Sequence, residues 1–181
     1  EALARRDAPT LVLTVYATSA DAGLGEGYWL GREEGVEAAY AKMAGVPNRW
    51  ITSSVTVAGR AVRLRTLSDA PLVQLAFMRL PDGAVLGTGS EVYSFQGLER
   101  LRAGDISTMR AHDGTATYTK ESFRDALVGF MTLYQPTVVR TLDFVGSYGD
   151  GDHSDHHAVG YFVREASERW GGDHTLLAYQ G

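Results

Sequence analysis

Short apolar runs alternate with longer segments of helical periodicity along this chain. The runs that predict buried strands are Thr10–Tyr16, Leu72–Leu80, Thr137–Phe144 and His174–Tyr179. Ile51–Arg65 is rich in β-branched residues and is interrupted by Ala58-Gly59, which predicts a hairpin. The turn Pro81-Asp82-Gly83 ends the second of the four runs.

Helical periodicity predicts three long helices and a short one. Their ranges are Trp29–Ala44, the segment from a Thr119 cap to Tyr134, about Asp155 to Trp170, and a short turn around Leu98–Arg102. In the first helix, the stripe expected to be buried is Val36, Ala39, Tyr40 and Met43, and Gly45 is expected to end the helix. The residues expected to face solvent there are Arg32, Glu33, Glu34 and Glu37.

The order of strands, loops and helices predicts an α/β fold of Rossmann-like layers. Strand, loop and helix follow one another at least three times, which favours a mostly parallel sheet with helices on both faces. We expect residues 1–181 to form a single domain. Because ligands gather beyond the carboxyl ends of such strands, the loops Asp21–Gly27 and Asp150–His157 are expected to meet at the functional edge.

Composition narrows the function classes. The chain is 44% hydrophobic with a formal net charge of −5, which argues against binding to a nucleic-acid backbone. No apolar run approaches the ~18 residues of a membrane span. The chain has no cysteine, so disulfides, thiolate catalysis and cysteine-based zinc sites are excluded. The absence of cysteine is compatible with either an oxidising or a reducing compartment.

The stretch Asp152-His153-Ser154-Asp155-His156-His157 is the strongest chemical signal. Imidazole is the commonest neutral metal ligand, and neighbouring carboxylates orient such rings or move protons. His153 and His156 are three residues apart at the start of a predicted helix, so both can face one side. The stretch therefore suggests a metal-assisted hydrolytic site, and its alternative is a polar loop with exposed histidines. A calcium loop is rejected, because Asp155 and Tyr161 stand where glycine and glutamate are required.

Other polar motifs have simpler interpretations. Gly23–Gly27 lies between a strand and a helix, but Tyr28 replaces the third glycine of a dinucleotide fingerprint, so a flexible turn is favoured over a nucleotide-binding loop. His112-Asp113-Gly114 is interpreted as a turn, and His174 as a structural residue at the start of the last strand.

A set of short motifs follows one order along nearly the whole chain. They are Thr18–Gly23, Tyr28–Gly35, Ala38–Tyr40 with Met43–Gly45, Leu80–Gly83, and Gly151–Gly160 preceded by Arg140–Asp143. This set resembles the PIG-L/LmbE-like family of metal-dependent de-N-acetylases, which includes mycothiol-pathway and glycopeptide sugar deacetylases.

The resemblance implies a zinc-type divalent ion and hydrolysis of an N-acetyl group on an amino sugar or related glycoconjugate. It assigns His156 as the metal ligand, His153 as the electrostatic or acid catalyst, and Asp155 as the residue that orients this site. Substrate contacts map onto Asp21, Arg32 and Asp82.

The chain departs from the family at both ends. The remaining metal ligands and the general-base aspartate of the family belong to an H-P-D-D element upstream of the equivalent of Thr10–Tyr16, and the sequence lacks this element. The chain also stops at Gly181, where family members generally continue. We therefore expect a domain truncated at both ends, in which a missing N-terminal segment supplies the other ligands. Zinc affinity and hydrolysis by the 181 residues alone are expected to be weak.

Two further functions stay open. A non-catalytic carbohydrate-binding or partner-dependent segment would keep the pocket without activating water. A nucleotide-binding Rossmann module is disfavoured by Tyr28.

Overall fold

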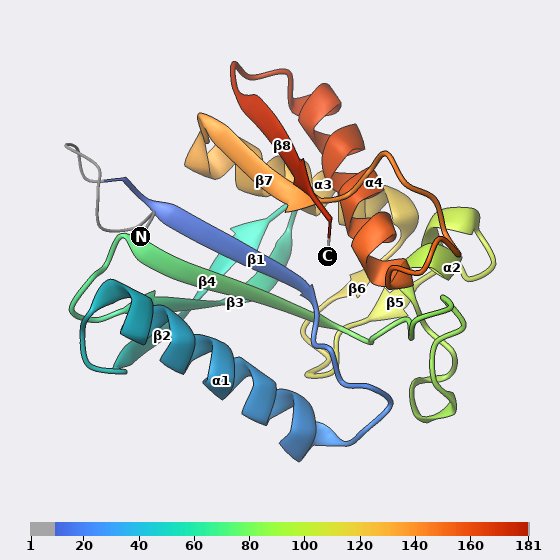
Figure 1. Ribbon diagram of the computed structural model, residues 1–181, viewed down its shortest axis with the longest axis horizontal. Coiled ribbons are helices and arrows are strands. Elements are labelled where there is room, and N and C mark those ends of the chain that lie inside the picture. Colours follow the sequence, from blue (N-terminus) through green and yellow to red (C-terminus); the bar gives the residue numbers. More distant parts are fainter. Residues whose placement is uncertain (1–9, 181) are drawn as a thin grey trace.

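The computed structural model describes residues 10–180, which form eight strands, four α-helices and a 3-10 turn (Figure 1). The strands are β1 (Val12–Thr18), β2 (Trp50–Val57), β3 (Arg60–Leu67), β4 (Val73–Leu80), β5 (Met109–Arg110), β6 (Thr117–Tyr118), β7 (Val138–Leu142) and β8 (Thr175–Tyr179). The helices are α1 (Glu26–Ala44), α2 (Leu98–Ala103), α3 (Lys120–Tyr134) and α4 (Ser154–Trp170), and the 3-10 turn is η1 (Glu91–Tyr93). Every predicted strand and helix is present, with ends shifted by a few residues.

The main sheet is mixed rather than mostly parallel. Its strand order is β1-β4-β3-β2, in which β1 and β4 are parallel while β2–β3 and β3–β4 are antiparallel. The hairpin explains this difference. Ala58 and Gly59 have φ values of 45° and 74°, and such a two-residue turn joins antiparallel neighbours only. The α/β class is confirmed, and the mostly parallel sheet is not.

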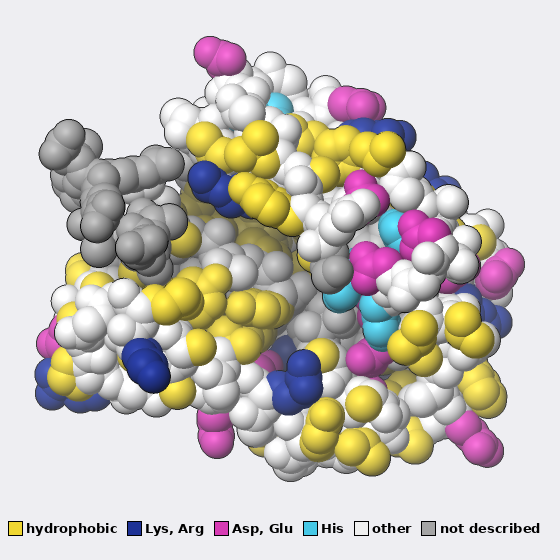
Figure 2. All heavy atoms as spheres, in the orientation of Figure 1, with side chains coloured by type: hydrophobic (Ala, Val, Ile, Leu, Met, Phe, Trp, Pro, Cys, Tyr) yellow, Lys and Arg dark blue, Asp and Glu magenta, His cyan; other side chains and the backbone are white. Residues whose placement is uncertain are grey.

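A second, parallel pair is formed by β7 and β8, with α4 as the connection between them. This pair runs alongside β1 in Figure 1, but β1 and β7 do not pair with one another. Within residues 10–180, β1 and β7 therefore each keep one edge without a strand partner. The face between them is hollowed and bordered by apolar side chains (Figure 2).

Alternate residues of the sheet contact helices on opposite faces. Ala76, Met78 and Leu80 of β4 join the large core with α2, α3 and α4. Val73 packs in a smaller cluster with Ala41 of α1. Helices on both faces of the sheet were predicted, and Figure 1 shows α1 on one side with α3 and α4 on the other. None of the helices in the described part of the chain is long and apolar enough to cross a membrane.

The buried face of α1 differs from the predicted stripe. The helix buries Trp29, Glu33, Glu37 and Ala41, whereas Met43 is 54% exposed and Ala39 is also exposed. Glu33 and Glu37, expected in solvent, bond to arginines on the sheet. Glu33 accepts two 2.7 Å hydrogen bonds from Arg79, and Glu37 accepts bonds of 2.6 and 2.9 Å from Arg65. Ionic pairs therefore share this interface with the apolar contacts of Ala41.

The ends of the helices follow their local sequence. Gly45 ends α1 with a left-handed φ of 71°, as predicted. Thr119 begins α3 and exchanges hydrogen bonds with Ser122 in a capping box. His153 begins α4, and its ring accepts a hydrogen bond from the Asp155 amide. This last end places the His/Asp motif at the functional edge.

Candidate active site

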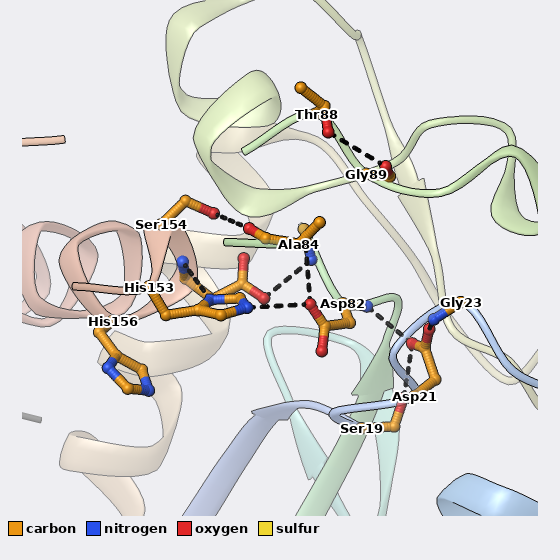
Figure 3. Close-up of polar contacts among 12 residues, drawn as sticks. Ser19, Asp21, Gly23, Asp82, Ala84, Thr88, Gly89, His153, Ser154 and His156 are labelled. Carbon is orange, nitrogen blue, oxygen red and sulfur yellow. Dashed lines mark hydrogen bonds and ion pairs between the residues drawn. The ribbon is translucent and has the colours of Figure 1, made fainter. Parts of the chain in front are cut away.

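Three loops meet beyond the carboxyl ends of β1, β4 and β7. Asp21 follows β1, Asp82 follows β4, and His153 stands at the start of α4 after β7 (Figure 3). The Asp82 amide donates to Asp21 Oδ2 at 2.7 Å, and His153 Nε2 lies 3.3 Å from Asp82 Oδ1. The expected meeting of the Asp21 and His153 loops is thus observed, with the Asp82 loop between them.

The His153 ring is held in one orientation by both nitrogens. Nδ1 accepts from the Asp155 amide at 3.2 Å, so Nε2 carries the proton and faces Asp82. The hydrogen bond to Asp82 raises the pKa of His153 above its usual value, the negative charges of Asp155, Asp82 and Asp152 add to this, and burial opposes it. The same pair lowers the pKa of Asp82, against the effect of its burial. Asp82 thus stabilises a proton on Nε2, and full protonation of the ring would require Nδ1 to release the Asp155 amide.

Asp155 lies behind His153 and is nearly inaccessible. It is 4% exposed, and its Oδ2 accepts the Gly83 amide at 2.9 Å. Its Oδ1 is buried and has no hydrogen-bond partner among the described residues. Burial raises the pKa of Asp155 to about 7. The group is therefore poised between a neutral acid and a carboxylate near neutral pH.

The start of α4 is fastened to the 83–85 loop by Ser154. Its hydroxyl donates to the Ala84 carbonyl at 2.7 Å, and its amide donates to the Val85 carbonyl at 3.1 Å. Gly83 is required at this contact, since a Cβ there would lie 2.6 Å from Asp155 Oδ1. These contacts hold Asp82, His153 and Asp155 in one cluster.

His156 lies one helical turn beyond His153 and faces a different partner. Its Nδ1 is 2.7 Å from Asp152 Oδ1, and its side chain is 37% exposed. In Figure 3 the ring points away from Asp82. A carboxylate on Nδ1 is the usual outer partner of a metal-binding histidine, because it leaves the Nε2 lone pair free. His156 therefore fits the role of a single metal ligand.

A second set of ligand atoms has a poorer fit to a metal. One atom each from Asp82, His153 and Asp155 lies within 4.8 Å of the others. However, both His153 nitrogens already take part in hydrogen bonds, one of them with Asp82. This geometry matches a proton-holding cluster better than a metal cage.

A family model described as PIG-L, GlcNAc-PI de-N-acetylase, matches residues 2–167. The chain belongs to the PIG-L family. Comparisons with curated proteins and with solved structures give no match. PIG-L proteins are deacetylases, which are hydrolases, and the family description indicates a GlcNAc-type substrate. The resemblance inferred from the sequence is confirmed at the level of the family.

Two residues that the resemblance assigns to substrate binding in this PIG-L domain differ in their access to solvent. Asp21 is completely buried, and its oxygens face the Gly23 amide, the Asp82 amide and the His112 ring. Arg32 is exposed on α1, where its guanidinium lies 5.9 Å from the centroid of the Tyr28 ring. The structure thus brings Asp21, Asp82, His153 and Asp155 together, while Arg32 lies on the outer surface of α1.

His112 is a polar residue of this region whose role the sequence did not indicate. It lies in the predicted turn, but its ring is 5% exposed and its Nε2 is 3.0 Å from Asp21 Oδ2. A lone histidine before Asp-Gly is typical of a turn, and its partner is 91 positions away. The feature of the sequence that could have indicated this role of His112 is that a histidine can pair with the acidic residues in the loops at the carboxyl edge of the sheet.

Proposed function

We propose that this PIG-L domain removes the N-acetyl group from an N-acetylated amino sugar or related glycoconjugate with the help of a zinc-type divalent ion. The observation that carries the proposal is the fixed His153 ring, whose protonated form is favoured by Asp82 and Asp155. His156, whose Nε2 has no hydrogen-bond partner among residues 10–180, lies beside it at a ring-centroid distance of 5.5 Å. An acid and a metal ligand so arranged are the components of amide hydrolysis.

In the proposed reaction water adds to the acetyl carbonyl carbon, the C–N bond breaks, and acetate and a free amine are released. When bound, a zinc-type ion polarises the carbonyl and lowers the pKa of water to about 7. His156 Nε2 would hold this ion. His153 stabilises the developing oxyanion and gives its Nε2 proton to the leaving nitrogen. The Asp155 amide fixes the neutral ring through Nδ1, and Asp82 favours the imidazolium that gives up this proton, in which Nδ1 is also protonated and releases the amide.

One histidine is too few ligands for a catalytic zinc ion, which usually has about three from the protein. We propose that a further strand lies between β1 and β7 and supplies the other ligands and a carboxylate base. Two features support this position for the additional strand. The edges of β1 and β7 that lack a partner border the hollow of Figure 2. In addition, β1 is mostly half-exposed despite its apolar sequence, whereas the interior strand β4 is mostly buried.

A second candidate function follows from the fact that His156 is the one imidazole among the described residues that we assign to the metal. Without the additional ligands, the same surface would bind an N-acetyl sugar without hydrolysing it. Metal content measured by atomic emission, together with amine release from N-acetylglucosamine derivatives, separates the two functions. Zinc binding with amine release supports the deacetylase, and sugar binding without either supports the non-catalytic domain.

The decisive variant is His156→Ala in protein that includes the proposed additional segment. Bound zinc and amine release are expected to fall about 100-fold or more, since losing even an outer-shell partner costs roughly 10–100-fold. His174→Ala is the matched control, because that imidazole bonds Ser167 and the Gly172 carbonyl at the opposite end of α4. Unchanged zinc content and activity in His156→Ala would remove the metal role from this residue.

A further inference from the structure

We infer that Asp21 and His112 are positioning residues that hold Asp82 against His153. This inference rests on the acid role proposed for His153. It replaces the substrate contact expected for Asp21, and it gives His112, interpreted from the sequence as part of a turn, a place in the site. The two residues act through the Asp82 loop and do not touch the reacting atoms.

Asp21 organises the loops after β1 and β4. Its Oδ1 accepts the Gly23 amide at 2.8 Å, which closes its own turn. Its Oδ2 accepts the Asp82 amide at 2.7 Å, which fixes the backbone of the neighbouring loop. A completely buried carboxylate is retained only where it is paired and hydrogen-bonded. Asp21 meets that condition by bonding the residue that faces the acid.

His112 completes the partners of the Asp21 carboxylate and ties its loop to β4. The ring Nε2 donates to Asp21 Oδ2 at 3.0 Å, and the backbone amide of His112 donates to the Arg79 carbonyl at 2.9 Å. The ring stacks on Trp29 at 5.3 Å between centroids and contacts Tyr93 at 4.3 Å. His112 thus fixes Asp21 relative to the end of the strand that leads to Asp82.

The remaining contacts of Asp82 connect the fixed backbone of its loop to His153, the proposed acid. With its amide held by Asp21, the Asp82 carboxylate accepts the Ala84 amide at 2.7 Å and lies 3.3 Å from His153 Nε2. A hydrogen bond of that length is already near the upper limit of its range, so a further displacement of a few tenths of an ångström would break it. Loss of the Asp21–His112 pair would release the Asp82 amide and weaken the partner of His153.

The test separates the donated hydrogen bond from the packing of the ring. His112→Phe keeps an aromatic ring between Trp29 and Tyr93 but removes the N–H, whereas His112→Gln keeps a donor near the same place and removes the ring. Asp21→Asn neutralises the acceptor without changing its size. His174→Phe is the control, since it alters an imidazole at the far end of α4. Thermal unfolding of each variant establishes that it is folded.

The readout is hydrogen exchange of the Asp82 amide, followed by NMR, because Asp21 Oδ2 accepts this amide. We expect His112→Phe and Asp21→Asn to speed this exchange about tenfold or more, with His112→Gln and His174→Phe close to wild type. In the catalytically complete protein the same two variants lower kcat about tenfold or more with little change in KM.

Unchanged exchange of the Asp82 amide in folded Asp21→Asn overturns the inference. It is also overturned if His112→Gln speeds the exchange as much as His112→Phe, because packing would then explain the effect. If His112→Phe does not fold, Asp21→Asn decides. Because hydrogen exchange needs no turnover, a protein that releases no amine but shows these changes would contradict the proposed function without contradicting the placement of Asp82.

Discussion

Asp155 is a residue whose ionisation the fold opposes. Its pKa rises from 3.8 to about 7, because its carboxyl is buried and one oxygen has no partner among residues 10–180. The folded chain therefore holds this proton more tightly than the unfolded chain. The contribution of the Asp155 proton to the free energy of unfolding is fully present below about pH 4, and it is lost as the pH rises through about 7. His153, whose pKa is raised above 6.5, changes stability in the same direction at higher pH.

The first prediction follows from this direction of the pH dependence of stability. Metal-free wild type is expected to lose stability between pH 5 and pH 8, and Asp155→Asn is expected to remove roughly 2–4 kcal/mol of that loss. Asn can still accept the Gly83 amide, so the contact with the loop is retained. Urea unfolding in chelator at the two pH values measures the effect. Equal pH dependence in the variant and wild type would show that Asp155 ionises freely in the folded chain.

The sequence predicted the residues whose partners are near in the chain better than those with distant partners. His153, Asp155 and His156 fall in one short motif at a helix start, so their grouping was visible. Glu33 was expected in solvent because a glutamate on an amphipathic helix usually faces water. Its partner Arg79 lies 46 positions away on a strand, and periodicity does not reveal such a pair.

At the scale of elements, the contact between α4 and β7 positions His153. Gly160 on α4 touches the end of β7 so closely that a Cβ would lie 2.4 Å from the Asp143 carbonyl oxygen. A side chain at this position would move the helix away from the strand. The glycine is thus a condition for the placement of the helix that carries the acid.

Gly160→Ala is expected to destabilise the protein by about 1–3 kcal/mol, through overpacking against backbone that cannot move aside. Gly31→Ala on α1 is the matched control, because nothing lies within 4 Å of its Cβ position. Ala is the better helix former there, so this variant should gain about 0.5–1 kcal/mol. Denaturant midpoints measure both changes. A neutral Gly160→Ala would mean that α4 can shift without loss.

Local signals located the elements well, but not the pairing of the strands. The Thr119 cap, Gly45 and the Ala58-Gly59 turn lie at the helix and strand ends that they predicted. Whether neighbouring strands are parallel depends on which strands pair. The order of strands and helices along the sequence did not show that both strands of the hairpin join the main sheet in antiparallel pairs.

At the scale of the whole molecule, the most consequential feature is that β1 and β7 each have one edge without a strand partner among residues 10–180. Val12 donates its amide to the Leu72 carbonyl, so alternation directs the amides of Leu13 and Val15 away from β4. These two amides face the hollow between β1 and β7. The structure therefore predicts a strand with one protected and one unprotected edge.

Hydrogen exchange provides the last prediction. Leu13 and Val15 should exchange much faster than Thr14, which alternation turns toward β4, so that Thr14 is an internal control. Adding the proposed strand should slow exchange at Leu13 and Val15 and leave Thr14 nearly unchanged. If all three amides are equally protected in the 181 residues alone, the edge is already covered.

The gap between β1 and β7 also separates the two halves of the acid. Asp82 follows β4, which pairs directly with β1, and His153 follows β7 on the other side of the gap. Their 3.3 Å contact therefore spans the gap, beside the bonds by which Ser154 fastens the same loop to α4. A strand placed in that space would border both halves of the acid, so we expect correct assembly to be registered at the Asp82–His153 contact.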